Sequence, residues 1–204
     1  MTVDDLKKWI HAAKSRIQEN KSYLSDLDQA IGDGDHGTNL ARGFEAAWTA
    51  IADKNYDDCG ALLRDVGMAL ISKVGGASGP LYGTAFMKMA LAAKEKGELT
   101  IRDWGCLMHE AAAGIQMRGK AEAGDKTMLD VWAPAGQYFN EHGEDFSWSN
   151  WKAFCQSRMA ATKGMKAKKG RASYLGSRSI GHLDPGSVSS YYLLSALAEC
   201  GEDA

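Results

Sequence analysis

Apolar residues recur every three or four positions along most of this chain, and no other feature restricts its fold more. This period places them on one face of an α-helix, whereas half-buried strands need an alternation of period two, for which we find no convincing example. A clear stripe near the start is Val3, Leu6, Ile10, Ala13 and Ile17. Because only 3 prolines occur in 204 residues, little interrupts such helices. The sequence therefore predicts an all-α fold.

The same spacing predicts further helices along the chain. These lie around residues 40–51, 62–70, 104–115, 151–159 and 188–198. Segments near residues 22–30, 80–95 and 125–140 are added to give roughly eight helices in all. At this length one hydrophobic core is sufficient, and no linker rich in serine or proline divides the chain. We therefore expect a single domain over residues 1–204.

Two helix starts carry a capping signal. Thr2 with Asp5, and Thr100 with Asp103, resemble capping boxes, in which a hydroxyl and a carboxylate three residues apart satisfy backbone N–H groups at the start of a helix. These pairs predict where the first helix and the helix near residue 104 begin.

Charge and cysteine content exclude several classes of protein. A net charge of -2 gives no general attraction to nucleic acid or to an anionic membrane surface. The 4 cysteines are widely spaced, without a Cys-x-x-Cys pair, which favours free thiols. The acidic start and the lack of an 18-residue apolar run predict a cytoplasmic location.

Polar chemistry collects first in residues 28–39, where Asp28, Asp33 and Asp35 lie within eight positions. Such carboxylates repel one another unless water or a cation separates them, and oxygen ligands suit hard ions such as magnesium. An EF-hand is excluded because its Asp-x-Asp-x-Asp start and its glutamate at position twelve are missing. The alternative is that these aspartates cap helices or lie in solvated turns.

Three later clusters also combine glycine with polar residues. Residues 75–84 could bring backbone N–H groups close to a phosphate at a helix start, or could simply allow close helix packing. In residues 118–130, Asp125 or Thr127 could cap the next helix. The irregular stretch 162–186 carries many lysines and arginines that could neutralise a polyphosphate, although such a run is usually solvated surface.

Taken in order, these clusters resemble the nucleotide-binding subunit, or L subunit, of bacterial dihydroxyacetone kinase, especially its phosphotransferase-system-dependent form. The resemblance is carried by residues 32–37 (GDGDHG), 75–80 (GGASGP), 124–128 (GDKTM) and 169–176 (KGRASYLG). It implies a barrel of eight helices with a nucleotide, ADP or ATP, and two magnesium ions at one end.

The resemblance also implies a role for individual residues. Asp28, Asp33 and Asp35 match the family's metal ligands. Its nucleotide contacts match His36, Gly37, Thr38, Asn39, Ala77, Ser78, Gly119, Met128, Arg171, Asp184, Pro185 and Gly186. Arg171 is expected to be catalytic, because it would stabilise the charge that develops during phosphoryl transfer.

The implied activity is that of a phosphotransferase with two partners. A phosphohistidine carrier of the phosphotransferase system would phosphorylate bound ADP, and the ATP would serve a separate subunit that binds dihydroxyacetone, giving dihydroxyacetone phosphate. Alternatives are the nucleotide subunit of an ATP-dependent kinase for another short ketose, and an interaction protein that senses nucleotides.

Overall fold

The chain folds into helices joined by short loops, and the computed structural model describes all of residues 1–204. The α-helices are α1 (Val3–Glu19), α2 (Lys21–Ile31), α3 (His36–Ile51), α4 (Cys59–Lys73), α5 (Ser78–Ala92), α6 (Ile101–Gly119), α7 (Leu129–His142), α8 (Trp148–Ala161) and α9 (Pro185–Glu202). Three short 3-10 helices are η1 (Gly143–Asp145), η2 (Thr162–Gly164) and η3 (Arg171–Ser179). No strand forms beyond one isolated bridge, so the all-α prediction is confirmed.

Both predicted capping boxes are present. The Thr2 and Thr100 hydroxyls accept N–H groups from Asp5 and Asp103, whose carboxylates accept the N–H groups of the two threonines in return. These pairs therefore fix the starts of α1 and α6.

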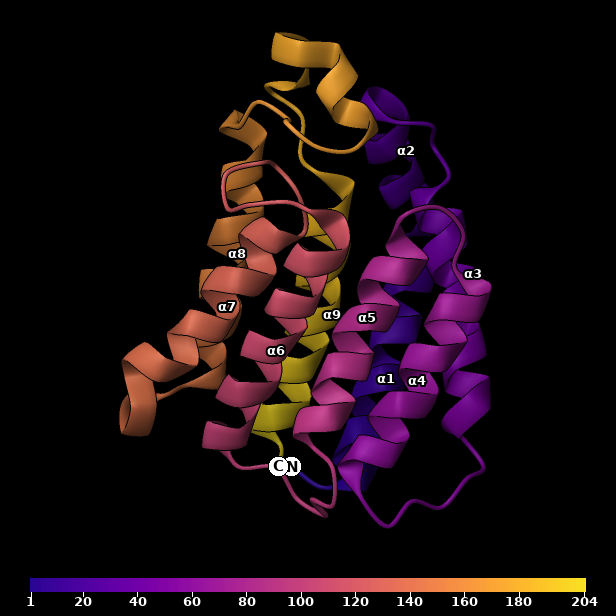
Figure 1. Ribbon diagram of the computed structural model, residues 1–204, viewed down its shortest axis with the longest axis vertical. Coiled ribbons are helices and arrows are strands. Elements are labelled where there is room, and N and C mark those ends of the chain that lie inside the picture. Colours follow the sequence, from indigo (N-terminus) through magenta and orange to yellow (C-terminus); the bar gives the residue numbers. More distant parts are fainter.

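Eight of the helices form a closed ring. In the order α1, α3, α4, α5, α6, α7, α8 and α9, each packs on the next, and α9 returns to pack on α1 (Figure 1). The ninth, α2, is set off from α1 by a break at Asn20 and packs on α3 and α9. The chain thus has one helix more than the rough number predicted, with a ring of eight.

Consecutive helices of the ring run in opposite directions, as short connections require. The N-termini of α3, α5, α7 and α9 therefore lie at the same end of the ring, opposite both chain termini (Figure 1). This alternation decides where backbone N–H groups without helical partners collect.

One hydrophobic core of 46 buried residues fills the ring. Trp9, Trp132 and Trp151 are fully buried, and each indole N–H finds an acceptor 2.9 Å away. The core is therefore apolar without leaving these donors unsatisfied. None of the helices has the length and apolarity that crossing a membrane requires.

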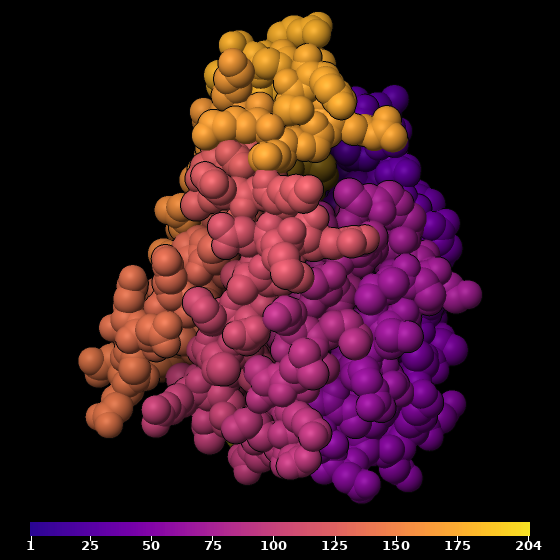
Figure 2. All heavy atoms as spheres, viewed as in Figure 1, coloured from indigo at the N-terminus to yellow at the C-terminus, as the bar shows by residue number.

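Residues 163–182, which we call the cap, lie over the end of the ring that carries these N-termini (Figures 1 and 2). The segment is irregular, as predicted, and contains η3 with a break at Gly176, where φ is +57°. The irregular stretch ends earlier than residue 186, because α9 begins at Pro185 with Asp184 as its N-cap.

The helix expected near residues 125–140 begins later, at Leu129. The Asp130 carboxylate accepts N–H groups from Gly124 and Thr127, at 2.5 and 2.8 Å, and so holds residues 124–127 in a turn. Asp125 does not cap α7, since its carboxylate accepts the Glu122 N–H instead.

Candidate functional site

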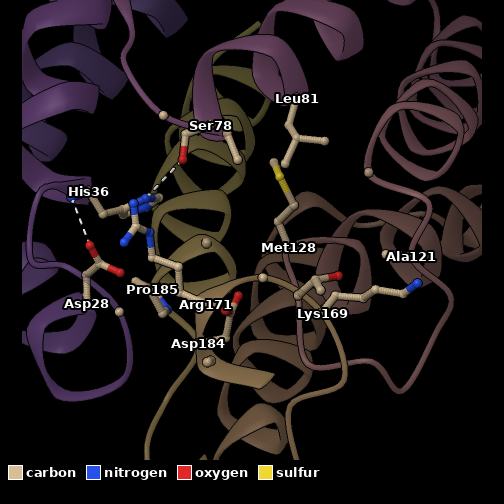
Figure 3. A pocket seen from close by; sticks show the side chains of 18 of the residues that line it. Asp28, His36, Ser78, Leu81, Ala121, Met128, Lys169, Arg171, Asp184 and Pro185 are labelled. Carbon is tan, nitrogen blue, oxygen red and sulfur yellow. Dashed lines mark hydrogen bonds between the residues drawn. The ribbon is translucent and has the colours of Figure 1, made fainter. Parts of the chain in front are cut away.

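A pocket of about 680 Å³ opens beneath the cap (Figures 2 and 3). It is within the range of ordinary small-molecule sites. All four polar clusters of the sequence contribute to its lining, although they lie far apart along the chain. The fold therefore brings these clusters together.

Four helix N-termini meet at this pocket. Its lining includes the first residues of α3, α5 and α9 (His36, Ser78 and Pro185) and Met128, which directly precedes α7. The N-cap residues of α3 and α5, Asp35 and Ala77, form no capping bond with their own side chains. Backbone N–H groups and the helix dipoles thus make this end of the ring favourable for an anion.

The acidic side of the pocket is formed by Asp28, at the end of α2, and by Asp33 and Asp35 in the following loop. One carboxylate oxygen from each lies within 4.8 Å of the others. Asp35 occupies the N-cap position of α3, yet its carboxylate accepts no N–H group there. Two of the three carboxylates are also exposed, so an incoming cation could reach them.

Asp28 also shapes the loop itself. Its Oδ2 accepts the N–H groups of Asp35 (3.0 Å) and His36 (3.2 Å), which fixes the start of α3. The helix-capping alternative therefore describes part of the role of Asp28. Gly32 packs directly on this side chain, and a Cβ there would overlap the carboxylate.

His36 is buried with both ring nitrogens engaged. Nε2 lies 2.9 Å from the Ser189 hydroxyl, and Nδ1 lies 3.1 Å from the Ser78 hydroxyl. Burial lowers the pKa of the imidazole below its usual value. The Ser189 hydroxyl also hydrogen-bonds the Tyr82 hydroxyl, at 2.7 Å. His36 therefore links the starts of α3, α5 and α9. It is held as a structural link and is poorly placed to act as a nucleophile.

Arg171 reaches the acidic side from the cap. Its guanidinium lies 3.0 Å from the Asp33 carboxylate, and both side chains remain partly exposed. Figure 3 shows it extending toward His36, whereas Lys169 points the other way, toward Ala121. Arg171 therefore places a positive charge beside the three aspartates.

The opposite wall is apolar. Leu81, Ile115 and Met128 line it, and Met128 points toward Leu81 in Figure 3. Spacing alone indicates such residues only as core, and their place at a pocket depends on how α5, α6 and α7 pack. The pocket thus has an acidic side and an apolar side.

Asp184 lies between the cap and α9. Its carboxylate accepts the Ser187 N–H at 2.6 Å, and burial raises its pKa to about 6. Asp130 raises the pKa further, while Lys126 opposes the rise. A carboxylic acid with a raised pKa at a pocket is typical of functional sites.

Twelve of the predicted site residues line the pocket: Asp28, Asp33, Asp35, His36, Ala77, Ser78, Gly119, Met128, Arg171, Asp184, Pro185 and Gly186. Gly37, Thr38 and Asn39 do not. Gly37 packs on the Lys21 backbone, and the Asn39 amide oxygen accepts from Arg42, at 2.7 Å. The roles of all fifteen residues in binding stay predictions.

Several lining residues were not predicted as part of the site. They are Ile31, Gly32, Gly75, Gly76, Pro80, Leu81, Ile115, Arg118, Ala121, Lys126, Thr127, Lys169, Gly170 and Ala172. Nine of these fourteen belong to the motifs that carry the resemblance, so membership of a motif was the available signal.

Comparison with known proteins identifies relatives over nearly the whole chain. The model of the DAK2 domain matches residues 30–199. The PEP-dependent dihydroxyacetone kinase 1, ADP-binding subunit DhaL, of Listeria innocua is 48% identical over 194 residues, which are 94% of this chain and 93% of that protein. The PTS-dependent dihydroxyacetone kinase, ADP-binding subunit DhaL, of Lactococcus lactis is 45% identical over 98% of each chain.

Solved structures show the same fold. The dihydroxyacetone kinase of C. freundii, in complex with AMP-PNP and Mg²⁺, superposes with a TM-score of 0.75 at 20% sequence identity. The match covers 95% of this chain and 33% of that one, so this fold forms about a third of the larger enzyme. Because the domain model spans most of the sequence and relatives more than 40% identical cover nearly all of it, the chain belongs to the DAK2 domain family.

Proposed function

We propose that this chain is the ADP/ATP-binding subunit of a dihydroxyacetone kinase, and that residues 1–204 form one L-type nucleotide-binding domain. The observation that carries the proposal is the pocket beneath the cap, where three aspartates and four helix N-termini face an apolar wall. The names of the relatives from Listeria innocua and Lactococcus lactis support the same activity.

The two sides of the pocket suit the two parts of a nucleotide. A purine base is flat and largely apolar, and the wall of Leu81, Ile115 and Met128 offers it a matching surface. Phosphates need positive potential and N–H donors. The start of α5 at Ser78 supplies both, and the start of α9 supplies the Gly186 N–H, because Pro185 has none. We therefore place the base against the apolar wall and the phosphates under the cap.

The donor set on the acidic side fits magnesium. Asp28, Asp33 and Asp35 offer hard oxygen ligands close enough to share ions. Magnesium usually takes only a few protein carboxylates and completes its coordination with water and phosphate, so two ions and a diphosphate together satisfy these three side chains. Bound there, magnesium would neutralise and orient the phosphate oxygens.

Arg171 is the residue that we assign to catalysis. Its guanidinium already lies on the acidic side, at the Asp33 carboxylate, and is close to where the phosphates are placed. Transfer of a phosphoryl group depends mainly on positioning and on neutralising charge. His36 orients the Ser78 hydroxyl and carries no phosphoryl group, because both of its nitrogens are already bonded.

We infer that two partners use this pocket in turn. A phosphohistidine carrier of the phosphotransferase system transfers its phosphoryl group to ADP held here. A separate kinase subunit, which binds dihydroxyacetone, then receives that group from the ATP and releases dihydroxyacetone phosphate. The words PEP-dependent and PTS-dependent in the names of the relatives support this order.

The first test is mass analysis of the small molecules that the purified protein releases on denaturation. We expect about one ADP per chain, because a cofactor-like nucleotide should remain bound through purification. In a second test, added ATP with the substrate subunit alone should support little turnover, and adding the phosphorylated carrier should restore it. Ready exchange of ADP and full turnover with ATP alone would contradict the role of the carrier.

A further inference from the structure

Lys126 is the only buried lysine or arginine in the chain, with a relative exposure of 1%. No carboxylate forms a salt bridge with its ammonium group. Instead the three donors of Nζ point to three backbone carbonyl oxygens, those of Met165 (3.1 Å), Ser179 (2.5 Å) and His182 (2.6 Å). A buried charge is tolerated only when its hydrogen bonds are satisfied in this way.

All three carbonyls belong to the cap. Met165 lies near its start, whereas Ser179 and His182 lie near its end, so one side chain from the body of the protein holds both ends of the segment. The ends are also joined to each other, because the Gly181 N–H donates to the Lys163 carbonyl at 2.8 Å. The cap is therefore a closed loop whose base is attached at Lys126.

The part of the cap that reaches the pocket lies between these attached ends. Residues 169–172 line the pocket, and Arg171 meets Asp33 at the acidic side. That ion pair is partly exposed and therefore weak, whereas the bonds of Lys126 are buried. The Lys168 N–H also donates to the Asp125 carbonyl at 3.0 Å, so neighbouring residues of the body, Asp125 and Lys126, hold the cap. The position of Arg171 thus depends more on these attachments than on its own ion pair.

Lys126 itself lines the pocket, and a lysine there would ordinarily be assigned to a phosphate. That assignment does not fit, because its three N–H donors are already used by carbonyls of the cap. We propose that Lys126 is a positioning residue that fastens the cap over the bound nucleotide and so sets how long the nucleotide remains bound. This inference rests on the proposed nucleotide site.

The test replaces Lys126 by methionine, which keeps the length of the side chain and removes the ammonium. The matched control is K7M. Lys7 also donates to two backbone carbonyls, those of Ala52 (3.2 Å) and Lys54 (2.6 Å), but far from the pocket, near the end of α3. Both variants lose the same kind of bond, and only one of them loosens the cap.

Two quantities are measured in wild type, K126M and K7M. The first is the rate at which a fluorescent ADP analogue dissociates, with magnesium present, when unlabelled ADP is added in excess. We expect dissociation to be at least about tenfold faster in K126M, because bonds to a buried charge are lost, and unchanged in K7M. A rate in K126M within about twofold of wild type, or an equal increase in K7M, would overturn the proposal.

The second quantity is the rate of trypsin cleavage within the cap, at residues 163–171, without nucleotide. K126M should be cut about tenfold faster there, while K7M should match wild type. This measurement separates two failures. If wild type binds no ADP analogue, the proposed function is wrong, whereas equal cleavage of the cap in all three proteins refutes the role of Lys126.

A second variant covers the case in which K126M does not fold. Ser179 is fully buried, and its hydroxyl accepts the Ala167 N–H (2.9 Å) and donates to the Gly176 carbonyl (2.6 Å). S179A loosens the same segment without touching a charge. It should accelerate both ADP release and cleavage of the cap, by about threefold. Wild-type rates in S179A would count against the proposal.

Discussion

At the scale of single residues, we expect the carboxylate of Asp33 to have the largest effect on nucleotide binding. It is exposed, belongs to the cluster of three aspartates and also pairs with Arg171. D33N keeps the size of the side chain and removes one charged ligand. We expect the affinity for ADP measured with magnesium to fall about 100-fold, or about 2.7 kcal/mol, by isothermal titration calorimetry.

The control for this measurement is D26N. Asp26 is exposed on α2 and lies outside the cluster, so its replacement changes the net charge equally and should leave the affinity unchanged. If D33N and D26N bind ADP with magnesium equally well, the three aspartates do not hold the metal.

Asp184 predicts a dependence on pH. Burial raises its pKa from 3.8 to about 6, with Asp130 adding to the rise and Lys126 and Ser187 opposing it. Between about pH 4 and pH 6 the folded protein therefore binds a proton that the unfolded chain has lost, so the contribution of Asp184 to stability falls as the pH rises through this window.

D184N should remove this pH-dependent contribution to stability and keep a side chain that can cap α9. Its free energy of unfolding relative to wild type should increase between about pH 4 and pH 7, by less than about 3 kcal/mol, since water reaches the site through the pocket. Urea titrations of both proteins at several pH values measure it. A difference that is constant across this range would contradict the assignment.

At the scale of helices, much of the structure could be predicted because its causes are local. Apolar spacing and the hydroxyl and carboxylate of a capping box act within a few residues, so the starts of α1 and α6 were predictable. The start of α7 was not, because Asp130 reaches back to Gly124 and Thr127 and holds them in a turn. Such a return contact leaves no periodic signal.

The site, too, has a part that could be predicted from local sequence and a part that could not. Three aspartates in eight residues are visible in any reading of the sequence, and their closeness in the fold follows from their closeness in the chain. The motif at residues 124–128 placed Lys126 near the site, but its burial was not predictable, because a lysine between Asp125 and Thr127 usually lies at the surface. Its burial depends on a cap that is 39 to 56 residues further along the chain.

Glycine determines how closely two of these helices approach. At Gly37, in the first turn of α3, a Cβ would overlap the Lys21 carbonyl of α2. G37A should therefore separate α2 from α3, which flank the loop of Asp33 and Asp35, and lower the free energy of unfolding by about 1–3 kcal/mol. Chemical denaturation measures the loss, and the affinity for ADP with magnesium should fall as well.

The matched control is G97A, at a loop position where the nearest atom to a new Cβ is 3.9 Å away. We expect G97A to be within about 0.5 kcal/mol of wild type. Equal stability of G37A and G97A would show that α2 and α3 are not in such close contact.

At the scale of the whole molecule, the alternating direction of the ring separates two functions. One end carries the chain termini and both capping boxes, and the other collects four helix N-termini, the three aspartates and the cap. Neither set of groups at the second end suffices alone, because the N-termini favour an anion and the aspartates favour cations. A metal ion and a phosphate should therefore bind together.

Thermal unfolding tests this coupling in protein from which bound nucleotide and metal have first been removed, in four samples: protein alone, with magnesium, with ADP and EDTA, and with ADP and magnesium. A ligand at 100 times its dissociation constant stabilises the folded state by about 2.7 kcal/mol, which in a chain of this size raises Tm by about 5–10 °C. We expect that shift only in the fourth sample. ADP alone would place its phosphates beside the three aspartates, and magnesium alone would lie beside the positive ends of the helices. An equal shift with ADP and EDTA would mean that the nucleotide binds without the aspartates, and the cluster would then need another explanation.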